Sequence, residues 1–258
     1  MTFSLKLKTV QSDIIKTLFE ALKQILSETN IEFTPEGMRI LTMDESHSVL
    51  IRLNLEGDKF NDYHCPAPII IGVDLNQLFS LLKSMGKEDV LTFYIRDDDP
   101  NCLGIVMENN VKGEISCYQL KLQEPSSEQY KIPQHEYPYI TNMPSADFQK
   151  ICRNMKNLSA ERMDIKHHKD QLFFRCEGEY ATQETIRTSG TNLQLIKTSD
   201  KMYAGTFDLD KLVDFVKCTG LGSTVTILMQ NMYPLIFIYP VGGLGDITLC
   251  LAPLNNSE

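Results

Sequence analysis

The sequence predicts an α+β protein made of two tandem domains of similar fold. The stretch Val73–Phe93 aligns without a gap to Phe207–Ile227, at a constant separation of 134 positions (207 minus 73). A second pair of segments, beginning at Ser12 and Ser145, matches at a separation of 133 (145 minus 12). Two independent segments that share nearly one offset indicate a duplicated domain.

Each copy of the longer repeat has the pattern of a helix, a glycine and a strand. Asp74 and Asp208 precede the two helices, where a carboxylate accepts hydrogen bonds from first-turn amides. Gly86 and Gly220 follow, and we expect them to take the left-handed turn that ends many helices. The predicted helices cover residues 74–85 and 208–219.

The rest of the first domain alternates between strand and helix patterns. Phe3, Leu5 and Leu7 alternate with polar residues, which is typical of a strand with one buried face. Residues 12–26 carry an apolar stripe at helical spacing. Further strands are expected at residues 33–41, 49–55, 90–95, 102–108 and 114–122.

The second half repeats this order after a segment without periodicity. Residues 123–137 contain two prolines and paired serines, which is typical of a connector. A helix is expected near residues 145–158, followed by strands at 163–166 and 171–177. The predicted organisation is an N-terminal domain over residues 1–122, a connector over 123–137 and a C-terminal domain over 138–258.

Composition indicates a globular protein of a reducing compartment. The 258 residues are 42% hydrophobic and 23% charged, and no apolar run is long enough to span a bilayer. Because the N-terminus alternates apolar and polar residues, we expect no signal peptide and no membrane partner. The seven cysteines form no CxxC pair and are expected to be reduced thiols, mostly buried.

Enzyme motifs are absent from the sequence. No GxSxG, HExxH or P-loop pattern occurs, and the cluster Gly220-Leu221-Gly222 follows a helix, the reverse of a phosphate-binding loop. His167 and His168 would either point to opposite faces of a strand or sit in a surface turn, and the turn is the favoured interpretation. We therefore predict no catalytic residue, no metal site and no cofactor.

Positive side chains lie opposite the apolar stripes of the predicted helices. Lys150, Arg153 and Lys156 do so in the helix near 145–158, and Lys83 and Lys217 occupy matched positions in the repeat. Solvated lysines are common on amphipathic helices. The pattern alone leaves two interpretations open, a basic binding surface and an ordinary solvated face.

Five ordered stretches match one known family: LFEALK from Leu18, MDESH from Met43, MPSADFQKICR from Met143, GSTVTIL from Gly222, and Leu251-Ala252-Pro253. On these residues the chain resembles the proliferating cell nuclear antigen (PCNA) family, the eukaryotic-type DNA sliding clamps, over essentially its full length. The resemblance implies a DNA-clamp fold and a head-to-tail homotrimer, with helices lining the inner face and antiparallel sheets outside. It implies that the ring encircles duplex DNA without reading its sequence, through Lys16, Lys23, Lys83, Lys150, Arg153, Lys156, Lys211 and Lys217.

The resemblance also implies an apolar pocket beneath the connector, which binds a short helical turn of partner proteins. The implied partners are a DNA polymerase, the clamp loader and other proteins with a PCNA-interacting peptide. Ser48 and Cys250 replace larger apolar residues that are usual in the family, which implies a wider pocket. The implied pocket residues are Met43, His47, Leu50, Tyr130, Ile132, Pro133, Tyr137, Pro234, Ala252 and Pro253.

Ring closure in the family pairs an edge strand of one chain with an edge strand of its neighbour. Here these strands would be Lys112–Leu120 and Glu177–Thr185. Lys169 falls at a position that carries ubiquitin-type modification in some relatives. The resemblance fits a nuclear protein or one from the cytoplasmic replication compartment of a large DNA virus.

Other functions remain open from the sequence. A subunit of a hetero-oligomeric checkpoint-type clamp is one, since the basic faces are sparse and Ser48 and Cys250 depart from the family pattern. A peptide adaptor that never encircles DNA is another. An enzyme is disfavoured because no nucleophile, base and orienting group occur together.

Overall fold

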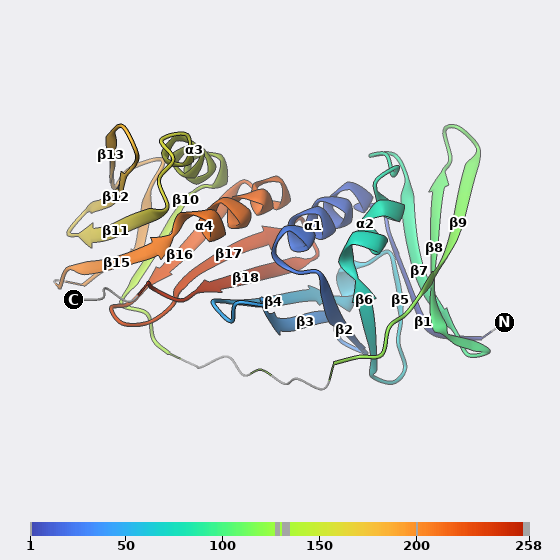
Figure 1. The fold of residues 1–258 in the computed structure, drawn as a ribbon. Coiled ribbons are helices and arrows are strands. Elements are labelled where there is room, and N and C mark those ends of the chain that lie inside the picture. The colour runs from blue at the N-terminus through green and yellow to red at the C-terminus, as the bar shows by residue number, and fades with distance from the viewer. Residues whose placement is uncertain (1, 127–129, 131–134, 200, 255–258) are drawn as a thin grey trace. The chain divides into compact units, whose positions relative to one another are not determined.

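The computed structural model describes residues 2–126, 130, 135–199 and 201–254 (Figure 1). It forms two compact units. The segment Met43–Leu50 belongs to the second unit although it lies early in the chain, and Thr248–Glu258 belongs there too. The first unit comprises Met1–Thr42, Ile51–Tyr130 and Pro240–Ile247, and the second comprises Met43–Leu50, Lys131–Tyr239 and Thr248–Glu258.

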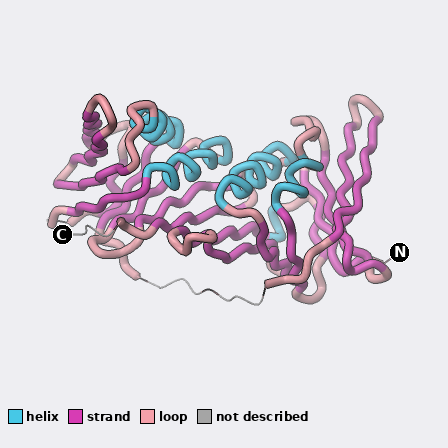
Figure 2. The backbone as a smooth tube through the Cα atoms, viewed as in Figure 1, coloured by secondary structure: helices cyan, strands magenta, loops and turns pink. Residues whose placement is uncertain are grey.

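In the first half of the chain, two helices lie against each other (Figure 2). The α1 helix buries Ile15, Leu18 and Leu22, so its stripe faces the core as the sequence predicts. Asp74 caps α2 by accepting a hydrogen bond from the Gln77 amide. The elements are β1 Phe3–Thr9, α1 Ser12–Ile25, β2 Glu28–Thr34, β3 Gly37–Met43, β4 Val49–Glu56, the 3₁₀ helix η1 Gly57–Lys59, β5 Asp62–His64, β6 Ile69–Asp74, α2 Leu75–Leu82, β7 Val90–Arg96, β8 Asp99–Asn109 and β9 Glu114–Lys121.

The second half repeats this arrangement with α3 and α4 in contact. Phe237 of β17 contacts both helices. Its ring stacks on Phe148 of α3, with 5.0 Å between ring centroids, and meets Phe215 of α4 edge-on, with 5.7 Å between centroids. Asp208 caps α4 through the amides of Asp210 and Lys211. The elements are β10 Tyr139–Pro144, α3 Ser145–Lys156, β11 Arg162–His168, β12 Gln171–Glu177, β13 Thr182–Thr188, β14 Gln194–Lys197, β15 Tyr203–Asp208, α4 Leu209–Phe215, the 3₁₀ helix η2 Val216–Leu221, β16 Thr224–Met229, β17 Leu235–Val241 and β18 Gly245–Leu251.

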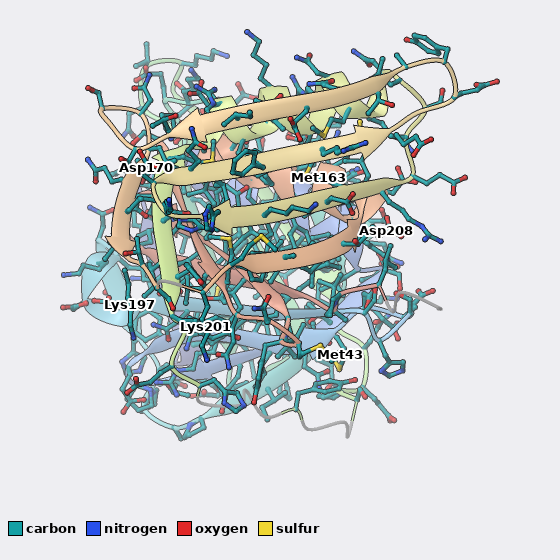
Figure 3. The ribbon with its side chains drawn as sticks, turned by 90° about the vertical axis from the view of Figure 1, so that its left-hand side faces the viewer. Met43, Met163, Asp170, Lys197, Lys201 and Asp208 are labelled. Atoms are coloured by element: carbon teal, nitrogen blue, oxygen red, sulfur yellow. The ribbon has the colours of Figure 1, made fainter. Side chains whose placement is uncertain are left out.

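The strand orders confirm that the halves are duplicates. The order β5-β1-β7-β8-β9 in the first half corresponds to β14-β10-β16-β17-β18 in the second. The order β4-β3-β2-β6 corresponds in the same way to β13-β12-β11-β15. Figure 3 shows this second sheet face-on, with Met163 of β11 and Asp208 of β15 at the same end of neighbouring strands. The β18 strand is therefore the counterpart of β9, and β4 is the counterpart of β13.

These counterparts differ in what they pair with. Strand β18 pairs with β4, and two backbone hydrogen bonds beside this pairing run from Glu56 to Leu244 and from Ala252 to Ser48, each at 2.9 Å. In the part of the chain that the structure describes, β9 and β13 stand at the edges of their sheets. Their outward residues include Ile115 and Ile186, which are 65% and 48% exposed.

Several sequence expectations need correction. Neither Gly86 nor Gly220 adopts a positive φ. The α2 helix ends at Leu82, before its glycine, and α4 tightens into η2, which contains Gly220. The edge strand expected at 177–185 lies at Thr182–Thr188, because residues 178–181 form the turn after β12.

The two adjacent histidines do not sit in a surface turn. Both end strand β11, and the side chain of His167 is fully buried against the Tyr139 ring, with 4.9 Å between centroids. His168 is exposed, as strand alternation requires. All seven cysteines are free thiols, and five of them are buried, in agreement with the sequence.

Candidate nucleic-acid and peptide interfaces

Four of the eight cations that the resemblance assigns to DNA are exposed at their helices. Their side chains make no hydrogen bond or ion pair with the residues that the structure describes. Lys83 directly follows α2, and Lys217 lies in η2, which follows α4. The two are equivalent positions of the repeat because they are 134 positions apart (217 minus 83). Their charges are therefore available to an anionic ligand. The exposed set is Lys83, Lys150, Arg153 and Lys217.

The other four cations have partners within the protein. The Lys16 ammonium donates to the Met85 carbonyl at 2.8 Å, and Lys23 lies 4.5 Å above the centroid of the Phe79 ring. Lys156 pairs with Asp210 at 2.6 Å. This last pair joins α3 to α4 at the surface, where ion pairs contribute little to stability. Periodicity placed these residues on polar helix faces but could not show how far their charges are already compensated.

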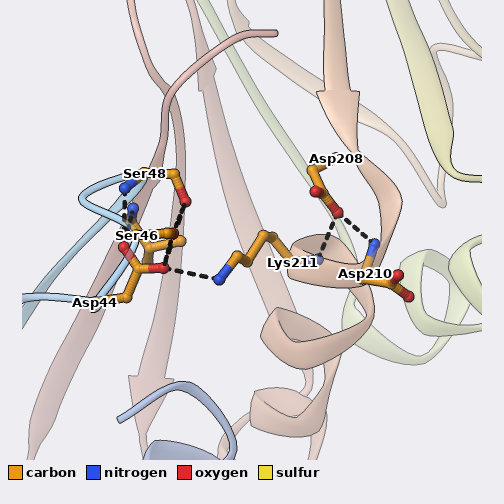
Figure 4. Close-up of polar contacts among 7 residues, drawn as sticks. Asp44, Ser46, Ser48, Asp208, Asp210 and Lys211 are labelled. Carbon is orange, nitrogen blue, oxygen red and sulfur yellow. Dashed lines mark hydrogen bonds and ion pairs between the residues drawn. The ribbon is translucent and has the colours of Figure 1, made fainter.

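Lys211 is held most firmly. Its ammonium donates to the Asp44 carboxylate at 2.7 Å (Figure 4). The Asp44 side chain is only 2% exposed. A phosphate contact by Lys211 would break this pair and leave a buried carboxylate without its cation, which is costly.

Asp44 also organises the turn between β3 and β4. Its Oδ1 accepts hydrogen bonds from the amides of Ser48 and Val49 at 2.9 and 2.8 Å, and its Oδ2 accepts from the Ser46 hydroxyl. Burial alone would raise the pKa of this carboxyl, but the hydrogen bonds from Lys211, Ser46 and Val49 outweigh it and lower the pKa to about 2. The carboxylate therefore stays ionised at neutral pH.

An apolar cluster lies on the face of the second unit's sheet that is opposite the helices. Because Phe237 points toward α3 and α4, the alternating Ile236 and Ile238 point to the other face. Such a face is usually polar when it meets water. We call this group the outer apolar cluster, and its members are Tyr137, Ile236, Cys250, Leu50, Ile140, Leu228 and Ile238.

The structure brings some of the predicted pocket residues into this cluster. Leu50 and Tyr137 belong to it, together with Cys250. Burial, followed by the neighbouring Cys250 and Tyr233, raises the pKa of the Tyr137 phenol. The Ala252 amide donates to the Ser48 carbonyl, so the C-terminal segment runs beside the β3–β4 turn.

The remaining predicted pocket residues differ in their placement. His47 and Ala252 are exposed, whereas Met43, Pro234 and Pro253 are half-buried. Tyr130 lines a groove over the β2, β3 and β4 strands of the first unit, with Leu41 and Ile70. Two predicted residues, Ile132 and Pro133, lie outside the described part of the chain.

Sequence reasoning missed the four aliphatic residues Ile140, Leu228, Ile236 and Ile238. A signal for them was present, because the β17 sequence LIFIYPV is apolar on both faces of the strand. In a sheet with one face exposed to solvent, apolar and polar residues should alternate along each strand. Apolar residues on both faces of the strand indicate that the outward face is also covered or binds a partner.

The described residues hold no group of three or more histidine, cysteine, aspartate or glutamate side chains placed to bind a metal ion. Among the helices that the structure describes, none has the length and apolar character to cross a membrane.

Comparison with a solved structure identifies the class of the fold. The crystal structure of proliferating cellular nuclear antigen from Entamoeba histolytica superimposes with a TM-score of 0.90 at 23% identity, covering 98% of this chain and 100% of that one. The chain thus has the DNA-clamp fold, and the predicted α+β class is confirmed.

Sequence comparison then gives the family. The model of the PCNA N-terminal domain matches residues 4–130, and that of the C-terminal domain matches residues 131–254. The chain belongs to the proliferating cell nuclear antigen family. It is 32% identical to "Probable DNA polymerase sliding clamp 1" of Paramecium bursaria Chlorella virus 1 over 251 residues, covering 96% of both chains. It is 31% identical over 254 residues to the proliferating cell nuclear antigen of Chaetomium thermophilum, covering 96% of this chain and 97% of that one.

Proposed function

We propose that this protein is a DNA sliding clamp, a homotrimeric ring that encircles duplex DNA and tethers a polymerase and other DNA-processing proteins. The observation that carries the proposal is the pair of edge strands β9 and β13. They are the counterparts of β18 and β4, which pair with each other within the chain. If the internal pairing is repeated between chains, β9 of one copy pairs with β13 of the next, and a head-to-tail assembly follows.

Exposed backbone groups on an edge strand favour such pairing. Ile115 on β9 and Ile186 on β13 are apolar residues on exposed faces, and they would be covered in the assembly. A heterologous contact of this kind forms a closed ring if its rotation closes. Three copies give six similar halves, which is the arrangement that the family resemblance implies.

DNA would be held by phosphate contacts from the helices. Lys83, Lys150, Arg153 and Lys217 supply exposed positive charge for these contacts. Contacts to phosphate position a protein on DNA without reading its sequence. Weak contacts are sufficient because a closed ring cannot leave a circular duplex.

Partner proteins would bind at the outer apolar cluster. An amphipathic helical turn binds a groove by inserting aliphatic and aromatic side chains. The partly buried aliphatic residues Ile140, Leu228 and Ile238, with the buried Ile236, would supply such a surface. A DNA polymerase and a clamp loader are the expected partners, and the clamp itself would have no catalytic activity and no cofactor.

The two relatives fit either a nuclear or a viral replication site for this protein. One comes from a virus and the other from a cellular organism. Lys169 is exposed at the β11–β12 turn, where it has a positive φ of 54°. It is accessible for the modification that the resemblance suggests.

The proposal is tested by loading the protein onto nicked circular duplex DNA with a clamp loader and measuring retention by gel filtration. We expect retention on the circle and loss when the DNA is linearised. Retention on linear DNA with open ends would refute encirclement. An Arg153→Ala variant should still be retained on the circle, because topology and not this contact holds the ring.

A further inference from the structure

Lys211 differs from the other three partnered cations because its partner is a buried carboxylate. Its ammonium reaches from α4 to Asp44, which is distant in sequence and starts the turn between β3 and β4 (Figure 4). Both residues belong to the second unit. The Lys211 side chain is 28% exposed, whereas the Asp44 side chain is 2% exposed. The pair therefore connects a helix to the turn that carries the predicted pocket residue His47.

The Asp44 carboxylate fixes the shape of this turn. Besides Lys211, it accepts hydrogen bonds from the Ser48 and Val49 amides and from the Ser46 hydroxyl. The Asp44 backbone closes the same turn, since its amide donates to the Val49 carbonyl and its carbonyl accepts from the His47 amide, both at 2.9 Å. His47 has a φ of 53°, in the left-handed region that few non-glycine residues adopt.

The turn borders the outer apolar cluster. Leu50 is the second residue after the turn and packs against the cluster of Tyr137, Ile236 and Cys250. The Ser48 carbonyl accepts a hydrogen bond from the Ala252 amide. A shift of the turn would therefore move Leu50 and the segment at Ala252 together.

We propose that Lys211 is a positioning residue for partner binding and not a DNA contact. By neutralising the buried Asp44 carboxylate, Lys211 holds the turn from Asp44 to Ser48 in the shape that places Leu50 in the outer apolar cluster. Because the turn is already ordered before the partner peptide binds, binding does not carry the entropy cost of ordering the turn. The inference rests on the proposed peptide-binding function of the cluster.

The serine at position 48 belongs to the same polar network. The Ser48 hydroxyl lies 2.7 Å from the Ser46 hydroxyl and 3.4 Å from the Asp44 carboxylate. The side chain is thus directed into the polar network around Asp44. The Ser48 hydroxyl can hydrogen-bond within this network, whereas the larger apolar residue that is usual in the family has no polar group to do so.

The test compares four variants with wild type. Lys211→Met removes the charge with little change in length, and Lys211→Arg keeps a cation. The double variant Asp44→Asn with Lys211→Met removes both charges but retains acceptors for the Ser48 and Val49 amides. Lys217→Met is the matched control, because Lys217 is an exposed lysine in the 3₁₀ helix that continues α4.

The probe is a fluorescent synthetic peptide with one helical turn that presents an aliphatic and two aromatic side chains. Its affinity is measured by fluorescence anisotropy, and duplex DNA binding is measured in parallel over a salt series. We expect Lys211→Met to weaken peptide binding about tenfold through reduced preorganisation. Lys211→Arg and the double variant should recover most of the affinity, and Lys217→Met should match wild type.

DNA binding should respond in the opposite way. Lys217→Met should reduce the slope of log affinity against log salt by about 0.9 for each phosphate that is no longer neutralised, whereas Lys211→Met should leave the slope unchanged. Amide hydrogen exchange in Met43–Leu50 should become faster in Lys211→Met alone, since the Ser48 and Val49 amides depend on Asp44.

The possible failures are distinguishable. If wild type does not bind the peptide at all, the proposed pocket is refuted, and the role of Lys211 with it. If wild type binds but Lys211→Met binds equally well, the role of Lys211 alone is refuted. A double variant as weak as Lys211→Met would also overturn it, because the defect would then not arise from an uncompensated Asp44.

Discussion

Replacing Asp44 with asparagine is expected to make the protein less sensitive to acid. The carboxyl pKa is about 2 in the folded protein and 3.8 without the fold. Because the folded pKa is the lower one, its contribution to stability is complete above pH 3.8 and is lost as pH falls toward 2. The difference in pKa corresponds to about 2 kcal/mol at neutral pH.

The magnitude can be followed across the pH range. By pH 3, about 1 kcal/mol of this contribution is lost in wild type. The Asp44→Asn variant has no group that titrates at this position. The stability advantage of wild type over the variant should therefore shrink by about 1 kcal/mol between pH 7 and pH 3.

The assay is urea unfolding followed by circular dichroism, for both proteins at both pH values. The protein concentration is kept constant because assembly changes apparent stability. All other carboxyls are common to the two proteins, so the difference isolates Asp44. An advantage of wild type that is equal at pH 7 and pH 3 would refute the buried ion pair with Lys211.

Three further outcomes follow from the structure. Replacing Lys83 and Arg153 together by alanine should lower the salt slope of DNA binding by about 0.9 per phosphate contact; an unchanged slope in the salt titration would argue against these contacts. Phe148→Ala should destabilise the protein by about 3–5 kcal/mol in urea unfolding, because its fully buried ring packs on Phe237, and a destabilisation below about 1 kcal/mol would contradict that packing. Burial lowers the pKa of His167 below 6.5, so wild type should lose stability as pH falls below 6.5. Thermal unfolding at pH 7 and pH 5 should show that His167→Gln lacks this loss. Equal losses of stability in the two proteins would contradict the lowered pKa of His167.

The sequence predicted those features of the fold that depend on local chemistry. The apolar stripes of α1 and α3 and the carboxylate caps at Asp74 and Asp208 follow from residues within one or two turns. The residues at which the helices end could not be predicted in this way. Gly220 lies in a 3₁₀ turn whose geometry depends on packing of its neighbours Cys218 and Leu221, both buried.

The candidate sites show a similar division. Helical periodicity identified the exposed cations Lys83, Lys150 and Arg153, because a polar face can be read from spacing alone. The partner of Lys211 could not be found in this way, since Asp44 lies 167 positions away in sequence. His167 was misplaced because burial of a polar ring depends on strands that meet only in the folded structure.

The central claim is that β9 and β13 close a ring of three chains, and solution mass tests it most directly. Multi-angle light scattering over a concentration series, with wild type and an Ile186→Asp variant, would give the assembly state. We expect wild type to have three times the 29.4 kDa mass of the chain and the variant to dissociate, since a charge would enter the strand pairing. A wild-type protein that remains monomeric at micromolar concentration would contradict the account and favour a subunit of a hetero-oligomeric clamp or a peptide adaptor.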